Sequence, residues 1–139
     1  MKINGITYQV RAKDYAAAQE WYAKFLGRSP DFLPYEGFVG EVGFCEWKLM
    51  SEAECWLQVA EGEPAIGSGP IRFGVNDIHA HVARVVQSLG LPQPEIGTTP
   101  DGQVNYCTFT DPFGNRIGLF QDLQEFAQDW VEIDSPEPD

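Results

Sequence analysis

The most constraining feature of this 139-residue chain is an internal repeat. Asp14 precedes a stretch with apolar residues at helical spacing, and Gly27 ends it; Asp77 and Gly90 hold the same places around a second such stretch. Aspartate before a helix and glycine after it are typical of helix ends. Two copies are too few for a solenoid. The repeat therefore predicts one domain built from two related modules.

Strands are expected on either side of each predicted helix. Residues 6–12 and 71–75 alternate between apolar and polar side chains, which is typical of a half-buried strand. Further strands are predicted at about 31–35, 42–50 and 55–60 in the first half, and at about 93–97, 104–110 and 116–121 in the second. Turn-forming residues separate them, and residues 61–69 form the predicted linker. We expect a short helix from residue 122 to about 131, followed by an acidic tail.

Composition and charge exclude several classes of function. Hydrophobic residues make up 43% of the chain, as in globular proteins, and no apolar run approaches the roughly 18 residues of a membrane span. The start of the sequence lacks the apolar segment of a signal peptide, so a cytoplasmic protein is expected. The net charge of −12 argues against nucleic acid as a partner and would tolerate a cationic ligand.

The three cysteines and two histidines do not indicate a reactive or metal-binding site. Cys45, Cys55 and Cys107 lie far apart in the sequence, so free thiols that pack as small apolar residues are expected. His79 and His81 are two residues apart on a predicted helix and therefore face nearly opposite directions. We expect them to be solvated.

Two motifs resemble those of a known superfamily. Asp14-Tyr15 followed by Trp21-Tyr22-Ala23-Lys24-Phe25-Leu26-Gly27 is similar to the "D-L…F-Y…L-G" helix of the vicinal oxygen chelate superfamily, which includes glyoxalase I, bleomycin-resistance proteins, fosfomycin-resistance enzymes and extradiol dioxygenases. Asp111-Pro112-Phe113-Gly114-Asn115, followed by Arg116-Ile117-Gly118-Leu119, resembles its "D-P-x-G-N-x-I-E-L" signature. The resemblance covers both halves, from about residue 6 to 121.

The resemblance implies an α+β fold in which paired βαβββ modules form an incomplete barrel with helices outside. The expected organisation is a single domain over 1–139, with modules at about 1–62 and 68–121 and a C-terminal helix and tail over 122–139. Strand alternation then divides the side chains between two faces. Those expected to face the helices are Tyr8, Val10, Ala12, Ile71, Phe73 and Val75. Those expected to face a cavity are Thr7, Gln9, Arg11, Pro70, Arg72 and Gly74.

Metal-dependent members of the superfamily resemble one another in four ligands, supplied by the first and last strand of each module. The corresponding positions here are Thr7, Gln58, Pro70 and Gly118. Proline and glycine offer no side-chain donor, and threonine is a poor neutral ligand for a divalent cation. We therefore expect no metal and no other cofactor.

Polar and aromatic residues remain to line the expected cavity, as in most small-ligand sites. The candidate ligand-binding residues are Gln9, Arg11, Trp56, Gln58, Arg72, Tyr106 and Phe120. Trp56 and Phe120 could stack on a ligand or simply fill the barrel, and the two arginines could hold an anionic or carbonyl group or pair with glutamates. Of the neighbours Glu46 and Trp47, one must face the cavity and the other must face away, and the sequence leaves open which.

Three hypotheses for function follow. The first is a metal-free protein that binds a small molecule, similar to the bleomycin-resistance proteins, which sequester their ligand between two subunits. The second is a lyase, isomerase or dioxygenase-like enzyme with a divergent site, although no catalytic residue can be named. The third is a scaffold or regulatory subunit without a ligand. The resemblance also implies a homodimer.

Overall fold

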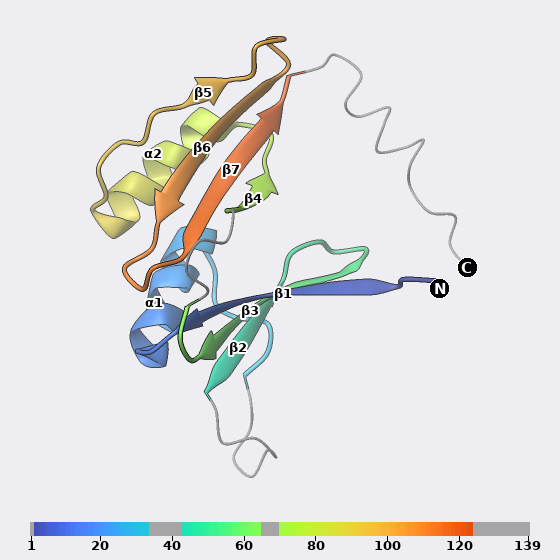
Figure 1. Cartoon of the computed structure of the whole chain (residues 1–139), viewed down its shortest axis with the longest axis vertical. Helices are drawn as coiled ribbons and strands as arrows, with labels where there is room; N and C mark the ends of the chain where they lie inside the picture. Colours follow the sequence, from blue (N-terminus) through green and yellow to red (C-terminus); the bar gives the residue numbers. More distant parts are fainter. Residues whose placement is uncertain (1, 34–42, 65–69, 124–139) are drawn as a thin grey trace.

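A computed structural model describes residues 2–33, 43–64 and 70–123. The described residues form two helices and seven strands in two halves of similar order (Figure 1). The first half contains β1 (Gly5–Ala12), α1 (Tyr15–Leu26), β2 (Phe44–Lys48) and β3 (Glu54–Glu61). The second contains β4 (Ile71–Gly74), α2 (Ile78–Leu89), β5 (Gly97–Thr98), β6 (Val104–Thr110) and β7 (Arg116–Asp122).

Both helices begin and end where the repeat predicts. Asp14 accepts a hydrogen bond from the backbone N–H of Ala17, and Asp77 accepts one from that of Ala80, each at 3.1 Å. The glycine after each helix has a left-handed backbone, with φ of 77° and 63°, which a residue without a Cβ adopts at little cost. The two helices thus share their end signals as well as their length.

The strands form two separate sheets of matching topology. The first, called sheet A here, has the order β1-β3-β2, and the second, sheet B, has the order β4-β7-β6-β5. In each sheet the first strand of the module pairs in parallel with the last one, and that last strand pairs antiparallel with its predecessor. The described strands do not close into a continuous barrel. The predicted α+β fold of paired modules is therefore confirmed.

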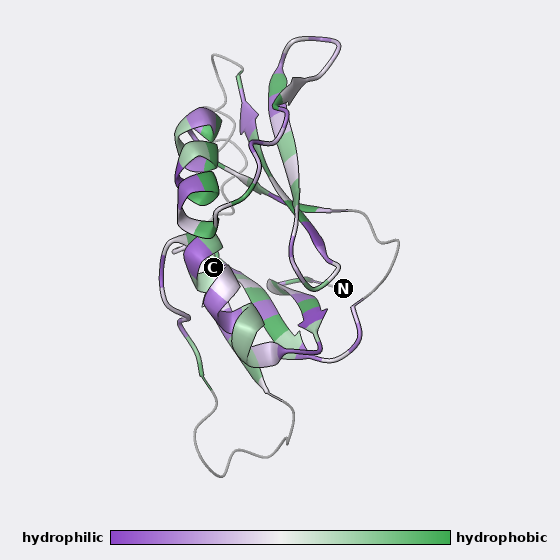
Figure 2. Cartoon of the chain, turned by 90° about the vertical axis from the view of Figure 1, so that its left-hand side faces the viewer, coloured by the Kyte–Doolittle hydropathy of each residue, from purple (hydrophilic) through white to green (hydrophobic). Residues whose placement is uncertain are grey.

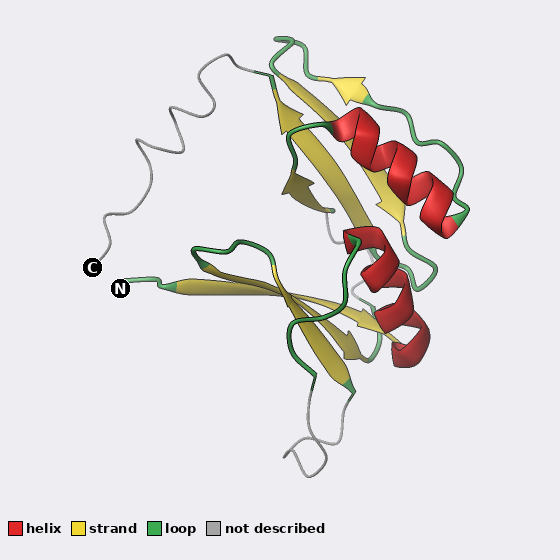
Figure 3. Ribbon diagram, turned by 180° about the vertical axis from the view of Figure 1, so that it is seen from behind, coloured by secondary structure: helices red, strands yellow, loops and turns green. Residues whose placement is uncertain are grey.

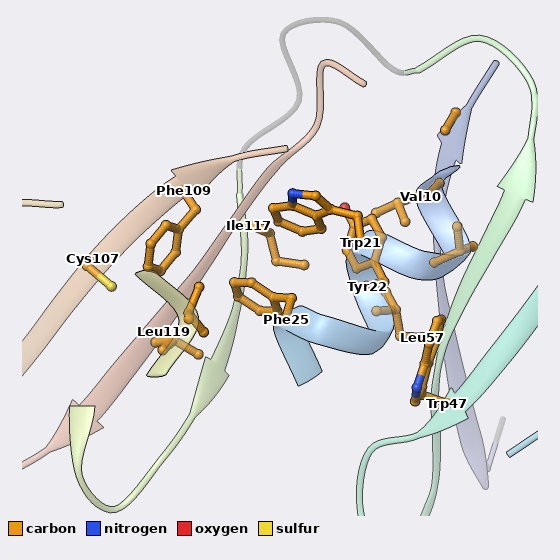
Figure 4. Packing of buried hydrophobic residues seen from close by; sticks show 14 of the residues in the cluster. Val10, Trp21, Tyr22, Phe25, Trp47, Leu57, Cys107, Phe109, Ile117 and Leu119 are labelled. Atoms are coloured by element: carbon orange, nitrogen blue, oxygen red, sulfur yellow. The ribbon is translucent and has the colours of Figure 1, made fainter. Parts of the chain in front are cut away.

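Helix α1 joins the two halves through a shared core. Trp21, Tyr22 and Phe25 lie between side chains from sheet A, such as Leu57, and side chains from sheet B, such as Phe109 (Figure 4). The Phe25 and Phe109 rings meet edge to face, 5.7 Å apart between centroids. Apolar and polar residues alternate in bands along both helices (Figure 2). Burial of the apolar bands is the main stabilising term for such an arrangement.

The two helices also contact one another. They lie on the same side of the molecule, which is clearest from behind (Figure 3). Arg84 of α2 donates hydrogen bonds to the carbonyls of Lys24 and Phe25 at the end of α1, at 3.0 and 2.8 Å. These carbonyls have no partner within their own helix, so the guanidinium satisfies them and connects the halves.

The predicted faces of β1 and β4 are confirmed. Val10 and Ala12 are buried beneath α1, whereas Gln9 and Arg11 are exposed on the opposite face. In β4 and just after it, Ile71, Phe73 and Val75 pack against the core, and Arg72 points away from it. We refer below to the sides of the sheets away from the core as their open faces.

Two strand predictions differ from the structure. Only residue 97 of the strand predicted at 93–97 is in a strand, because β5 comprises Gly97–Thr98 alone. Pro92 and Pro94 explain the difference, since proline has no N–H to give to a β-ladder. Of the strand predicted at 31–35, the described part forms a single bridge between Phe32 and Glu46.

Other predictions lie at the edges of the described chain. Residue 122 ends β7, so the helix predicted from there does not begin at that residue, and its remainder lies outside the described residues, as does most of the linker at 61–69. Cys45 and Cys107 are buried and Cys55 is half-buried, all three as free thiols, as expected. None of the described helices is long and apolar enough to cross a bilayer.

Candidate functional site

The open face of sheet A carries four of the predicted ligand-binding residues. Gln9 and Arg11 come from β1, and Trp56 and Gln58 come from the neighbouring β3. The two strands are paired so that Gln9 lies directly beside Gln58. The four residues share a face because each strand turns alternate side chains to the same side.

A chain of hydrogen bonds links three of these side chains. Arg11 Nε donates to Gln9 Oε1 at 2.6 Å, and Gln9 Nε2 donates to Gln58 Oε1 at 2.5 Å. This pattern fixes the direction of both amides and leaves the Gln58 amide nitrogen as a donor. Among the described residues, the terminal nitrogens of Arg11 have no bonding partner. The chain therefore presents unused donors on the open face.

These three residues line a hollow of about 400 Å³, a size suited to a small organic ligand. Phe44 of β2 and Ala60 of β3 supply apolar walls, and Glu61 supplies one carboxylate. Sequence reasoning missed Phe44. Its signal was strand alternation: a buried Cys45 places Phe44 on the same face as Gln58.

Trp56 lies on this face but beside the hollow. Its indole N–H donates to Glu54 Oε2 at 2.8 Å, and the Lys48 ammonium lies 3.4 Å from the other oxygen of that carboxylate. The hydrogen bond from Trp56, followed by the charge of Lys48, lowers the pKa of Glu54. The half-buried indole is thus held at the rim, with a partner of its own.

The orientation of Glu46 and Trp47 is now settled. Trp47 is fully buried, and its indole N–H donates to the carbonyl of Arg28 at 3.0 Å. Glu46 consequently lies on the open face, directly beside Gln58 in the register of the sheet. Burial raises the pKa of its carboxyl. The residue is a titratable group near the hollow that sequence reasoning could not assign.

The other three candidates gather on the open face of sheet B. The Arg72 guanidinium lies over the Tyr106 ring, 5.4 Å from its centroid, and donates to Thr108 Oγ1 at 3.2 Å. Phe120 lies beside Tyr106 in the register of the strands. Tyr106 is 38% exposed and Phe120 is 36% exposed, so two neighbouring rings are partly accessible on this face. The seven candidates therefore form two groups, one on each sheet.

Comparison with known proteins gives the same architecture. The sequence matches no model of a protein family, and it matches no curated protein. Among solved structures, a glyoxalase/bleomycin resistance protein from Catenulispora acidiphila DSM 44928 superposes with a TM-score of 0.67 at 24% identity, over 86% of this chain and 98% of that one. The chain has the glyoxalase/bleomycin-resistance fold.

Other structures with this fold have diverse functions. TnmS3, an antibiotic binding protein from Streptomyces sp. CB03234, has a TM-score of 0.68 at 23% identity, covering 88% of this chain and 98% of its own. A lactoylglutathione lyase from Agrobacterium tumefaciens has a TM-score of 0.58 at 18% identity, covering 84% and 91%. At these identities the likeness establishes the fold.

The positions at which metal-dependent relatives would supply ligands carry few donors. Thr7 and Gln58 lie on the open face of sheet A, and Pro70 comes just before β4. Gly118 is buried, and a Cβ added there would lie 2.2 Å from the carbonyl oxygen of Cys107. Within residues 2–33, 43–64 and 70–123, no three His, Cys, Asp or Glu side chains converge. His79 is exposed on α2 and His81 is partly exposed, away from both open faces.

Proposed function

We propose that this chain binds a small organic molecule in the hollow on the open face of sheet A and acts by holding it. The observation that carries the proposal is the chain of hydrogen bonds from Arg11 through Gln9 to Gln58. It orients polar groups beside an aromatic wall, a combination that small-ligand sites use to fix a bound molecule. The fold is shared with TnmS3, an antibiotic binding protein, which supports a binding role.

The ligand we propose combines an aromatic ring with a carbonyl or anionic group. Phe44, whose ring also stacks on Phe32 with 5.8 Å between centroids, supplies apolar contact for the ligand ring, and the terminal nitrogens of Arg11 offer paired donors for oxygen. The net charge of −12 would by itself favour a cation. Near the hollow, the Arg11 guanidinium outweighs this net charge. Its charge-assisted hydrogen bonds act directly on a bound oxygen, whereas the charges elsewhere on the surface are screened by salt.

We propose that binding needs no metal. At the four corresponding positions, Thr7 offers a hydroxyl, and Gln58 offers an amide whose oxygen already accepts a hydrogen bond from Gln9. Pro70 and Gly118 offer no side-chain atom that could bind a metal. Such a set does not fit a divalent cation, which takes several oxygen, nitrogen or sulfur donors at once. Metal analysis of the purified protein tests this: stoichiometric nickel, zinc, iron or manganese would overturn it.

We also propose a homodimer that completes the site. The second group of candidates, Arg72, Tyr106 and Phe120, stands exposed on sheet B, and a second copy would bring it over the hollow of sheet A. Light scattering should then give twice the mass of one chain. Phe120→Ser should shift the equilibrium to monomers, whereas Leu33→Ser, at an exposed position just after the bridge from Phe32 to the edge strand β2, should leave the mass unchanged.

Titration of aromatic acids tests the binding function. Benzoate and 2-naphthoate should raise the melting temperature, because a ligand that prefers the folded state stabilises it. Gln58→Leu removes the amide at the end of the hydrogen-bonded chain and should weaken binding about tenfold. Gln87→Leu, which makes the same change on the exposed side of α2, should bind like the unaltered chain. Equal affinity of both variants would exclude this hollow.

A second candidate function is a lyase, isomerase or dioxygenase-like enzyme. Glu46 favours it, because a carboxyl with a raised pKa beside a ligand hollow is suited to general acid–base chemistry. An acid that binds and carries a bond such an enzyme can break or rearrange should then be converted, which NMR spectroscopy of the incubated mixture would detect, including for a product of the same mass. Loss of product formation with Glu46→Gln, at unchanged affinity, would favour the enzyme over the binding protein.

A further inference from the structure

A second hollow, of about 510 Å³, lies where the two halves of the chain meet. The first half contributes Tyr8 to Arg11 of β1, together with Glu63 and Pro64. The second half contributes Asn115 and Arg116, at the start of β7. It adjoins the hollow on sheet A through Gln9 and Arg11, but the remaining walls are different. It is therefore a separate site with its own chemistry.

Two arginines line the hollow, one from each half: Arg11 and Arg116. Among the described residues, neither Arg11 nor Arg116 forms an ion pair with a carboxylate, in contrast to Arg28, which bonds to Asp31 at 2.5 Å. Glu63, the carboxylate in the lining, is already paired with Lys13 at 3.0 Å. Two uncompensated arginines in one hollow form a local positive site in a chain whose net charge is −12.

The backbones that carry these arginines are held together by a buried side chain. Asn115 Nδ2 donates to the carbonyl of Arg11 at 2.8 Å and to Asp111 Oδ2 at 2.9 Å. Asn115 is 9% exposed, and its own backbone N–H donates to Asp111 Oδ1 at 2.8 Å. Both arginines thus stand on a preorganised support, which lowers the entropic cost of binding.

We propose that this hollow binds the oxyanion group of a small molecule, a carboxylate or a phosphate, through Arg11 and Arg116. Guanidinium groups suit both, because their planar N–H donors pair with two oxygens at once. The site differs from the one proposed on sheet A in Arg116, which does not line that hollow, and it shares Arg11 with it. Because one Arg11 guanidinium serves both hollows, an oxyanion bound here and a ligand bound on sheet A should compete for it.

Calorimetric titration with inorganic phosphate and, separately, with citrate tests the proposal. Ionic strength is held constant with sodium chloride, so that general screening does not change. At least one anion should bind saturably to the unaltered chain. Arg116→Gln should weaken that binding about tenfold, the loss expected for a charge-assisted hydrogen bond. Lys24→Gln, which removes the same charge from the surface of α1, should have no such effect.

The outcomes separate this site from the one on sheet A. Saturable binding that Arg116→Gln weakens and Gln58→Leu leaves intact supports the proposal, and the preferred anion identifies the ligand as a phosphate or a carboxylate. Absence of saturable binding by both anions overturns it, as does equal affinity of the Arg116→Gln and Lys24→Gln variants. Unfolding curves of each variant are monitored by circular dichroism. A variant that unfolds at the same point as the unaltered chain has lost binding without losing its fold.

Discussion

The hydroxyl of Tyr22 donates a hydrogen bond of 2.6 Å to Asp111, which lies 89 residues further along the chain. Asp111 also accepts from the backbone N–H groups of Phe113 and Asn115 and from the Asn115 side chain. The turn at residues 111–115, one of the two motifs that resemble the superfamily signature, therefore connects helix α1 of the first half to the second half. Its buried polar groups are fully satisfied within the fold.

Removal of the Tyr22 hydroxyl should destabilise the chain. Burial, with the nearby charge of Asp111, raises the pKa of Tyr22, so the hydroxyl stays protonated and keeps donating at alkaline pH. Tyr22→Phe should lower the free energy of unfolding by about 1.5–3 kcal/mol, the range for a hydrogen bond to a charged group. Urea unfolding measures this. Tyr106→Phe, at an exposed ring, should cost less than about 0.5 kcal/mol, and an equal loss in both variants would contradict the role of the Asp111 contact.

Gly118 should tolerate no side chain. An alanine Cβ there would meet the Cys107 carbonyl at 2.2 Å, and backbone atoms cannot move aside without breaking the β6–β7 pairing. Gly118→Ala should therefore cost about 2 kcal/mol or more, and Gly118→Glu, which restores the acidic residue of the signature, should not fold better.

Gly74→Ala provides the control for Gly118. Its Cβ would meet the far end of the Phe120 side chain at 2.8 Å, and Phe120 is partly exposed and can rotate away. Gly74→Ala should lower the melting temperature clearly less than Gly118→Ala does. Similar melting temperatures for the two alanine variants would show that β6 and β7 adjust to a side chain at position 118.

The fold could be predicted from the sequence largely because its signals are local. Asp14, Gly27 and their repeats mark helix ends through hydrogen bonds and backbone angles that involve only neighbouring residues. The prediction at residues 93–97 overrated the strand pattern, because two prolines remove backbone donors from the ladder. In the described part of the strand predicted at 31–35, only Phe32 pairs with a strand, through one bridge to Glu46, so the pattern there overestimated the extent of pairing.

The candidate site was harder to predict because it depends on contacts between distant strands. Alternation assigned Gln9 and Arg11 to the open face, but it could not show that Gln9 lies beside Gln58 or that Arg72, Tyr106 and Phe120 lie on the other sheet. Glu46 and Trp47 were ambiguous for the same reason. Only the packing of Trp47 against the core, with its indole bonded to Arg28, decides which of the two faces the ligand side.

The three thiols should differ in reactivity. Cys45 is fully buried, and burial raises its pKa to about 11; burial also raises the pKa of Cys107. Since the thiolate is the reactive form, both should resist Ellman's reagent near neutral pH. Half-buried Cys55 should react first, giving one fast thiol in the native protein and three after unfolding in urea. Cys55→Ser should abolish the fast phase, and rapid reaction of the remaining two thiols would contradict their burial.

Glu46 should make stability depend on pH in a direction that burial sets. In the unfolded chain its carboxyl ionises at the ordinary value, whereas burial raises the pKa in the folded protein. When the pH is below the ordinary glutamate pKa, the carboxyl is neutral in both the folded and the unfolded state, so it does not lower the free energy of unfolding. As the pH rises through the folded pKa, the folded state must carry a poorly solvated charge, and stability is lost.

Glu46→Gln should therefore stabilise the chain near neutral pH, and this gain should vanish as the pH falls below the ordinary glutamate pKa. The gain is expected to be small because water still reaches part of the carboxyl. Glu95→Gln, at an exposed position after α2, removes the same charge and corrects for relief of the net charge of −12. Urea unfolding of both variants over a pH series measures the difference. If the free energy of unfolding rises equally in Glu46→Gln and Glu95→Gln at every pH, the effect comes from net charge alone. The Glu46 carboxyl would then be as well solvated as one on the outer surface.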